Sequence, residues 1–598
     1  MRNKLNYLIQ QLVNLLNEKL SPKQFLMFAA ILVGICTSLL ALFLKLSVAT
    51  IHHLFATDAL FSPVKEPFML IFPIIGILLS VVFTQKVLAG KLHRGVAHIL
   101  YEITKKSAFV QKHKIYSQII TSSFTVGLGG SAGLEAPIVV TGSAVGSVLS
   151  SVLKRGYRDR ILLLGCGAAA GIASVFNAPV AGIMFASEVL LAEVSVSSFL
   201  PLIISAACGA LFSQALLQEN TLFLFARQSP FDWTNTPYYL LLAFFTAFVS
   251  LYYLRVSQKI HQLFAKITLN PYLKALVGGC LLIGLIYLFP TLFGEGYSSI
   301  RALANGKADI LVQKSLFASW ENKKLVLLFF LGGTILIKAI ATSLTLSSGG
   351  NGGNFAPSLF VGAFSGFFFV RLFKMLGNTN LPESNFTIVG MAGVLAGVMY
   401  APLTGIFLIA EVTGGYELII PLMIVAGLTS FIVRQFEPIS PEFRAMIEKG
   451  EAFSENKDHN ILILMDIEKL VEHDFHTVPF HANLGEMVEI IKVSKRNIFP
   501  VVNQQQQLEG ILALDDLRSI MFETKNYEKI KVENLMKIPP ATITITESMT
   551  EVLDKFQQTK AWNLPVIDAT GKYRGFISKS SVLSQYREQL LRISPVSE

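Results

Sequence analysis

Two short stretches of the chain combine glycines, a proline and one carboxylate in a pattern that suits anion chemistry. Residues 133–146 read GLEAPIVVTGSAVG and residues 353–366 read GNFAPSLFVGAFSG, so both fit G-x-x-A-P-x4-G-x3-G. Because proline suits the first turn of a helix and glycines precede it, each stretch is predicted to begin a helix. The free N–H groups and the dipole of a helix start attract anions. Two such starts aimed at one point would form an anion site without a full positive charge.

Glu135 stands in the first of these helix starts, where the second copy carries Phe355. A carboxylate there can occupy the anion position itself, and it can swing away or take a proton and so yield to an ion. The alternative is a capping acid, which stabilises a helix by about 1 kcal/mol. An ionisable residue within an apolar segment favours the functional interpretation, a gate.

The composition is that of a membrane protein. Apolar residues make up 52% of the 598 residues and charged residues only 15%, against about 25% charged in soluble chains. Several apolar runs before residue 437 are long enough to cross about 30 Å of hydrocarbon, whereas others are short or broken. The chain is therefore predicted to be an α-helical polytopic membrane protein.

The charge pattern indicates how the chain lies in the membrane. Residues 1–23 are amphipathic and show no cleavage pattern, so they are expected to form an interfacial helix at a cytoplasmic N-terminus. The net charge of +10 fits basic cytoplasmic loops such as 154–160, and no basic stripe suits nucleic acid.

The four cysteines have no pairing spacing and no motif suggests a metal. The segment GGSAG at 129–133 fits the G-x-S-x-G of serine hydrolases, and an intramembrane hydrolase is kept as a remote alternative.

The chain contains two kinds of internal repeat. VFNAPVAGIMFASEV (175–189) and VMYAPLTGIFLIAEV (398–412) align at an offset of 223 with seven of fifteen positions identical. Such repeats place a substrate site near the membrane midplane. The predicted membrane domain is 24–436, with repeats at about 24–219 and 236–436, followed by a linker at 437–470. Residues 471–522 and 532–598 each read as β-α-β-β-α and resemble a tandem of CBS domains, predicted to be cytoplasmic and α/β.

Taken in order, the motifs resemble the CLC family of chloride channels and chloride/proton exchangers. GLEAP is similar to the family's G-[KR]-E-G-P, in which the glutamate is the gate, and GNFAP matches its G-x-F-x-P. The resemblance implies two inverted-topology repeats with broken helices, and a homodimer in the lipid bilayer with a chloride pathway in each subunit. No enzymatic activity and no required cofactor are implied. It places the gate at Glu135 and anion-binding groups at Gly133, Leu134, Gly353, Asn354, Phe355 and Ala356.

Two departures from the family pattern affect the inner side of this site. The family's serine loop corresponds to LHRGVAHIL (92–100), where Arg94 lies near the serine position. Arg94 either strengthens anion attraction or, as we favour, faces the cytoplasm. The family's inner tyrosine is missing as well, and alternative alignments put Glu442 or Phe443 in its place. The sequence therefore does not decide which residue forms the inner gate.

A third departure concerns the mechanism. Many family exchangers have two adjacent acids where this chain has Glu188 and Val189, and the second acid delivers protons from the cytoplasm. Val189 favours a passive channel, with a chloride/proton antiporter as the alternative, in which Glu193 one helical turn later could replace the missing acid. Glu188 and its repeat partner Glu411 are predicted to be structural.

The CBS pair resembles nucleotide-binding modules. Asp516 has the spacing of the family's ribose-contacting aspartate, and Ser581 stands at the equivalent position of the second module. One adenine nucleotide at most is expected, and the alternative is a pair that only braces the dimer.

We expect a bacterial inner-membrane protein with both termini in the cytoplasm, which transports chloride or another small anion and exchanges protons if it is an antiporter.

Overall fold

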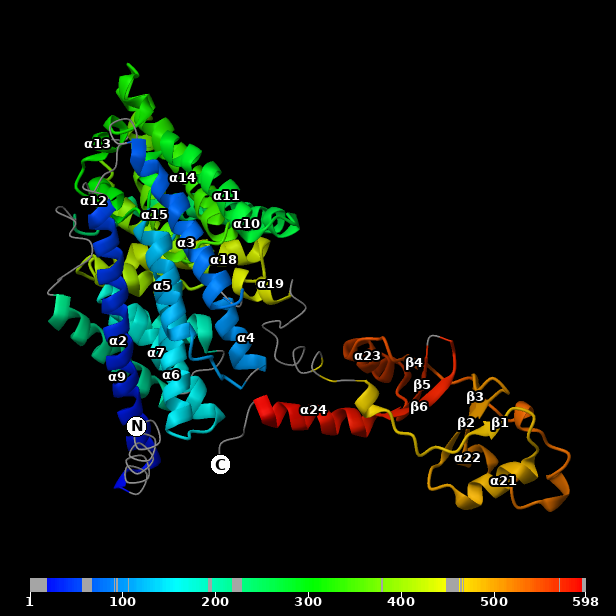
Figure 1. Ribbon diagram of the computed structural model, residues 1–598. Helices are drawn as coiled ribbons and strands as arrows, with labels where there is room; N and C mark the ends of the chain where they lie inside the picture. Colours follow the sequence, from blue (N-terminus) through cyan, green and yellow to red (C-terminus); the bar gives the residue numbers. More distant parts are fainter. Residues whose placement is uncertain are drawn as a thin grey trace. The chain divides into compact units, whose positions relative to one another are not determined.

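A computed structural model of the chain describes residues 19–55, 67–90, 92, 95–105, 107–191, 196–217, 229–377, 380–447, 462, 465, 467–568 and 570–593. The chain divides into two compact units, Met1–Ala445 and Met446–Glu598. The first is helical and the second is α/β (Figure 1).

The first unit is a bundle of helices in two successive sets (Figure 1). Within the described residues, ten helices are long and apolar enough to cross a membrane, which confirms the predicted multi-pass fold. The first set is α2 (Pro22–Phe55), α3 (Phe72–Val87), α4 (Ala97–Lys105), α5 (Lys114–Gly127), α6 (Glu135–Val152), α7 (Tyr157–Phe176), α8 (Pro179–Phe185) and α9 (Val196–Leu217). The second set is α10 (Thr236–Lys266), α11 (Pro271–Leu288), α12 (Tyr297–Ala304), α13 (Ala308–Gln313), α14 (Lys323–Ser347), α15 (Phe355–Met375), α16 (Glu383–Met399), α17 (Pro402–Val412), α18 (Ile419–Phe436) and α19 (Pro441–Ile447).

Glycines bring corresponding helix pairs close together in the two sets. A Cβ atom added to Gly142 of α6 would overlap the carbonyl of Gly167 in α7, and one added to Gly362 of α15 would overlap the carbonyl of Gly390 in α16. Small residues allow membrane helices to approach at backbone distance. The close packing expected from the glycine repeat is thus present in both halves.

Two acids join the halves by reciprocal capping. The carboxylate of Glu188, which follows α8, accepts hydrogen bonds from the N–H groups of Leu403 (2.9 Å) and Thr404 (2.8 Å) at the start of α17. The carboxylate of Glu411 in α17 accepts hydrogen bonds from Val180 (3.1 Å) and Ala181 (2.9 Å) at the start of α8. Each acid satisfies N–H groups that a helix start leaves unpaired, which confirms the structural role predicted for both.

The second unit contains two three-stranded sheets with the same topology. In each, a short first strand pairs in parallel with the second, which pairs antiparallel with the third. The first module has β1 (Val478–Pro479), α21 (Leu484–Val493), β2 (Ile498–Val502), β3 (Leu508–Ala513) and α22 (Leu514–Leu517). The second has β4 (Ile543–Thr544), α23 (Met549–Thr559), β5 (Asn563–Ile567), β6 (Tyr573–Ser578) and α24 (Lys579–Ile593). This is the predicted β-α-β-β-α order.

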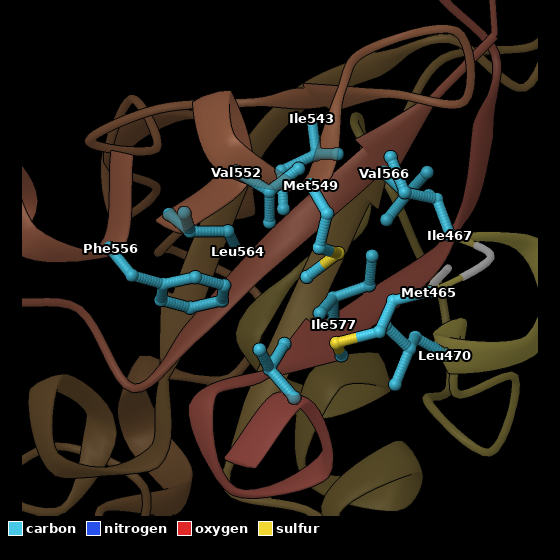
Figure 2. Packing of buried hydrophobic residues seen from close by; sticks show 11 residues of the cluster. Met465, Ile467, Leu470, Ile543, Met549, Val552, Phe556, Leu564, Val566 and Ile577 are labelled. Atoms are coloured by element: carbon cyan, nitrogen blue, oxygen red, sulfur yellow. The ribbon is translucent and has the colours of Figure 1, made fainter. Parts of the chain in front are cut away.

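The core of the second module includes residues that precede the first module in the chain. Met465, Ile467 and Leu470 fall in the predicted linker, yet they pack with residues of β5 and α23 such as Leu564 and Phe556 (Figure 2). The apolar face of α23 therefore covers a core that is completed by a distant segment.

Each sheet is extended by a segment that leads into the other module. Glu472 and Phe576 of β6 exchange main-chain hydrogen bonds of 2.7 and 3.0 Å. Lys537 and Ile511 of β3 do the same, at 2.9 Å in both directions. The two modules are therefore interlocked, and Glu472 and Lys537 occupy equivalent positions beside the third strands.

Candidate functional site

The two glycine-rich loops meet at the starts of α6 and α15. The N–H of Gly133 donates to the carbonyl of Gly353 (3.0 Å), and the N–H of Gly353 donates to the carbonyl of Gly133 (2.8 Å). This antiparallel pair fixes the first residues of the two helices, Glu135 and Phe355, beside one another. It also uses the N–H groups of both glycines, which were predicted to bind the anion.

The Glu135 side chain is folded back over this pair. It is 2% exposed, and a Cβ atom added to Gly133 would overlap its Oε2 atom. Tyr297 at the start of α12 donates its hydroxyl to Oε1 (2.8 Å). Within the described residues Oε2 has no hydrogen-bond partner, although the backbone amides of Glu135 and Ala356 face the carboxylate. The carboxylate therefore lies between the two helix starts.

The start of α15 offers main-chain donors in an apolar surrounding. Within the described residues the N–H groups of Asn354 and Phe355 donate to no acceptor. The Phe355 ring packs against Phe176 and Phe185, with centroids 5.4 and 6.2 Å apart. Amide donors in an apolar surrounding suit a weakly hydrated monovalent anion, because partial charges bind it without trapping it.

Three polar residues at this site were missed by the sequence analysis. The hydroxyl of Tyr253 in α10 donates to Oδ1 of Asn354 (3.2 Å). Tyr297 contacts Glu135, as described above, and Oε1 of Glu295 accepts a hydrogen bond from the N–H of Leu134 (3.3 Å). Glu295 carried a signal, because an acid within the apolar stretch that includes IYLFPTLFGEGY is unusual at membrane depth. No sequence pattern singled out Tyr253 or Tyr297.

The two candidates for the inner gate lie on α19. The N–H of Phe443 donates to Oγ of Ser440 (3.4 Å), and Glu442 is its neighbour on the first turn. Within the described part of the chain, no hydrogen bond joins either residue to Asn354 or Phe355. The hydroxyl group beside the second helix start comes instead from Tyr253.

The other candidates of the membrane unit are the proton-pathway positions, Arg94 and the hydrolase-like motif. Val189 lies in a π-helical turn, Ala186–Leu190, directly after the capping acid Glu188. Arg94 and Glu193 lie outside the described residues. Ser131 of the hydrolase-like GGSAG is fully buried, and within the described residues its hydroxyl has no partner that could act as a base.

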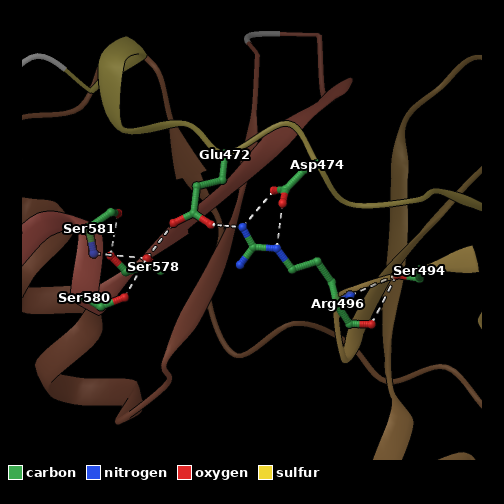
Figure 3. Close-up of polar contacts among 7 residues, drawn as sticks. All are labelled: Glu472, Asp474, Ser494, Arg496, Ser578, Ser580 and Ser581. Carbon is green, nitrogen blue, oxygen red and sulfur yellow. Dashed lines mark hydrogen bonds and ion pairs between the residues drawn. The ribbon is translucent and has the colours of Figure 1, made fainter.

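In the second unit the two candidate nucleotide residues have different partners. Asp516 in α22 forms an ion pair with Nζ of Lys537 (2.7 Å). At the equivalent position, Ser581 donates its N–H to Oγ of Ser578 (3.1 Å), and Ser578 donates its hydroxyl to Oε1 of Glu472 (2.6 Å; Figure 3).

Glu472 also connects the two modules through a cation. Its Oε2 atom lies 2.7 Å from Nη2 of Arg496, and Arg496 forms a two-pronged contact with Asp474 (2.8 and 2.9 Å; Figure 3). The first module thus has its own acid neutralised by a lysine. The second module lacks that acid and receives a carboxylate from a distant segment.

Comparisons with known proteins agree with this architecture. The family model described as voltage gated chloride channel matches residues 76–434, and the CBS domain model matches residues 466–523 and 532–588. The chain is 31% identical over 333 residues to the "H(+)/Cl(-) exchange transporter ClcA" of Vibrio cholerae, covering 54% of this chain and 67% of that protein. It is 27% identical over 369 residues to the "Putative chloride channel protein ClcB-like" of Ralstonia nicotianae, covering 61% of this chain and 81% of that protein.

Solved structures show the same fold. A slow cyanobacterial Cl-/H+ antiporter matches with a TM-score of 0.61 and 20% identity, over 73% of this chain and 100% of that one. A eukaryotic CLC transporter matches with a TM-score of 0.58 and 18% identity, over 93% of this chain and 97% of that one. Because the chloride channel model matches more than half of the chain and the CBS model matches both modules after it, this protein belongs to the voltage-gated chloride channel (CLC) family, with a carboxy-terminal pair of CBS domains.

Proposed function

We propose that this protein exchanges chloride for protons across a membrane, with Glu135 as the gate. The observation that carries the proposal is the buried Glu135 carboxylate between the starts of α6 and α15, with Oε1 held by Tyr297. A helix start that binds a carboxylate can also bind chloride, because both are monovalent anions. The carboxylate and the transported anion therefore compete for one position.

Proton binding would decide this competition. When Glu135 takes a proton, its negative charge is removed and the side chain leaves the helix start, so that chloride can enter. When Glu135 releases the proton, the carboxylate returns and expels chloride. The side chain leaves the site with its proton as chloride enters, and it returns without the proton as chloride leaves. The proton and chloride therefore move in opposite directions.

Passive conduction is the second candidate, and Val189 is the observation that favours it. The apolar side chain stands where many exchangers carry the acid that delivers protons from the inside. The relatives named as H(+)/Cl(-) exchange transporters favour exchange over the channel predicted from this residue. In the exchange mechanism Glu193 is our candidate for the inner proton donor.

We place both termini in the cytoplasm on the strength of the basic residues near the first span. The assembly that the family resemblance implies is a homodimer in the bacterial inner membrane, with one pathway per subunit.

We assign an adenine nucleotide to the first CBS module, because Asp516 has the spacing and the helix position of a ribose-binding acid. These assignments are independent of the transport mechanism.

A flux assay in sealed liposomes tests the transport proposal. The purified protein is reconstituted, an outward chloride gradient is imposed, and internal pH and chloride are followed together. Exchange predicts that chloride efflux drives protons inward against their own gradient. Chloride efflux without uphill proton movement would establish the channel instead, and no chloride flux in either direction would overturn both.

A further inference from the structure

A second carboxylate lies at the same helix start as Glu135. Glu295 belongs to the loop between the short helical turn Pro290–Leu292 and α12. Its Oε1 atom accepts a hydrogen bond from the N–H of Leu134, at 3.3 Å. Leu134 is the residue that precedes α6, so Glu295 occupies one of the donors that a helix start offers to an anion.

The loop that carries Glu295 is held firmly against the glycine-rich loop. The N–H of Gly294 donates to the carbonyl of Gly129 (3.0 Å), and the buried Lys338 of α14 donates from Nζ to the carbonyl of Gly294 (3.0 Å). Glu295 and Tyr297 are two positions apart and contact adjacent residues, Leu134 before α6 and Glu135 at its first position. The loop is therefore built to deliver two polar side chains to one point.

Charged and titratable groups from four elements interact electrostatically with Glu295. These groups are Glu135 of α6, Tyr297 of α12, Lys338 of α14 and Lys45 of α2. The two lysines attract the Glu295 carboxylate and Glu135 repels it. The buried Oε2 of Glu135, which has no hydrogen-bond partner within the described residues, lies at the same helix start.

An anion that enters at the start of α6 therefore meets two carboxylates there, one of which holds the Leu134 N–H. Resting on the gate role proposed for Glu135, we propose that Glu295 is a second displaceable carboxylate, which holds the Leu134 N–H until chloride takes it. Chloride binds the freed N–H, and the Glu295 side chain is drawn toward Lys338, which stabilises its charge. No bond or proton is transferred in this step. Glu295 thereby sets the chloride concentration at which the pathway fills, whereas Glu135 sets the coupling to protons.

The variant Glu295→Gln separates charge competition from a purely structural cap. Glutamine keeps the size of the side chain and can still accept the Leu134 hydrogen bond, but it carries no charge. Hydrogen bonds to charged groups are stronger than those between neutral groups. Chloride should therefore displace glutamine at a concentration about tenfold lower than it needs to displace the carboxylate. We expect the half-saturating chloride concentration of reconstituted protein to fall by about this factor, while the number of protons moved per chloride stays that of the parent.

Calorimetric chloride binding to detergent-solubilised Glu135→Gln protein, with and without Glu295→Gln, provides the second readout. We expect binding to tighten by a similar factor when Glu295 is neutralised. The matched control is Glu321→Gln, which removes an exposed negative charge from the same unit and should change neither quantity. If Glu295→Gln fails to fold, Glu295→Asp keeps the charge but shortens its reach, and it should lower half-saturation in the same direction.

An unchanged half-saturation and unchanged binding in folded Glu295 variants would overturn this inference and leave Glu295 as a structural cap. That outcome is distinct from failure of the proposed exchange, which is judged on the parent protein alone by uphill proton movement.

Discussion

The N–H groups of Gly133 and Gly353 donate to each other's carbonyls, at 3.0 and 2.8 Å, although 220 positions of sequence separate them. This pair holds two helix starts together at one point. A Cβ atom added to Gly353 would lie 2.8 Å from the Cβ of Ala136, so any side chain there would push the two starts apart. The spacing of the candidate anion site is therefore set by backbone contact between the repeats.

Replacing the gate should uncouple transport. In Glu135→Gln the side chain can no longer release a proton and return as a carboxylate, so proton coupling and the pH dependence of chloride flux should be lost while chloride still passes. The measurement is simultaneous chloride and proton flux in liposomes between pH 4 and pH 8. Glu321→Gln serves as the control and should behave as the parent. Parent-like coupling in Glu135→Gln would reduce Glu135 to a helix cap.

Removing a reciprocal cap should destabilise the membrane unit. In Glu188→Ala the N–H groups of Leu403 and Thr404 and the Thr404 hydroxyl lose their charged acceptor. Each lost bond to a charged group is worth about 1.5–3 kcal/mol. We expect a clear fall in the thermal unfolding temperature in detergent, and a similar fall for Glu411→Ala.

The exposed Glu417 is the matched control for this experiment, and Glu417→Ala should leave the unfolding temperature unchanged. Equal stability of Glu188→Ala and Glu417→Ala would show that the caps contribute little.

A methyl group between α15 and α16 should cost stability. A Cβ atom at Gly366 would overlap the carbonyl of Phe386, and backbone cannot move aside as a flexible side chain can. Overpacking of this kind costs about 1–3 kcal/mol, so Gly366→Ala should unfold at lower temperature. Gly284 of α11 has open space where its Cβ would lie, and Gly284→Ala should be neutral or stabilising by up to about 1 kcal/mol. The reverse order of the two variants in thermal unfolding would contradict the close packing.

The first CBS module should lose nucleotide affinity when its acid is removed. If Asp516 accepts two ribose hydroxyl hydrogen bonds, Asp516→Ala should weaken binding of an adenine nucleotide about tenfold to a hundredfold. Because the ion pair of Asp516 with Lys537 is partly exposed to solvent, stability should change by about 1 kcal/mol or less. Calorimetry with AMP, ADP and ATP on the purified protein provides the measurement.

The neighbouring Asp515, which is paired with Arg518 on the surface, offers the control variant Asp515→Ala. Loss of binding in both variants would point to charge alone, and the absence of heat in the parent at millimolar nucleotide would leave the CBS pair as a brace for the dimer.

The local sequence was sufficient for the elements and for the nature of the site. Pro137 and Pro357, each preceded by glycines, predicted two helix starts. Glycine frees the backbone for a loop and proline suits the first turn of a helix, and both effects act within a few residues. The short apolar segments FPVV and LPVI suit the strand that follows the first helix of each predicted β-α-β-β-α unit, and they lie in β2 and β5. An acid at a helix start in an apolar segment singled out Glu135, since such a residue is costly unless it has a function.

Only the tertiary structure decided which distant residues complete the site. Glu295 and Tyr297 lie about 160 positions from the residues that they contact, and the pairing of Gly133 with Gly353 uses N–H groups that were predicted to be available to the anion. The packing of Met465, Ile467 and Leu470 into the second CBS module also joins segments far apart in the chain. Backbone preference acts over a few residues, whereas these contacts depend on how whole helices and sheets pack, and that information is spread over the entire chain.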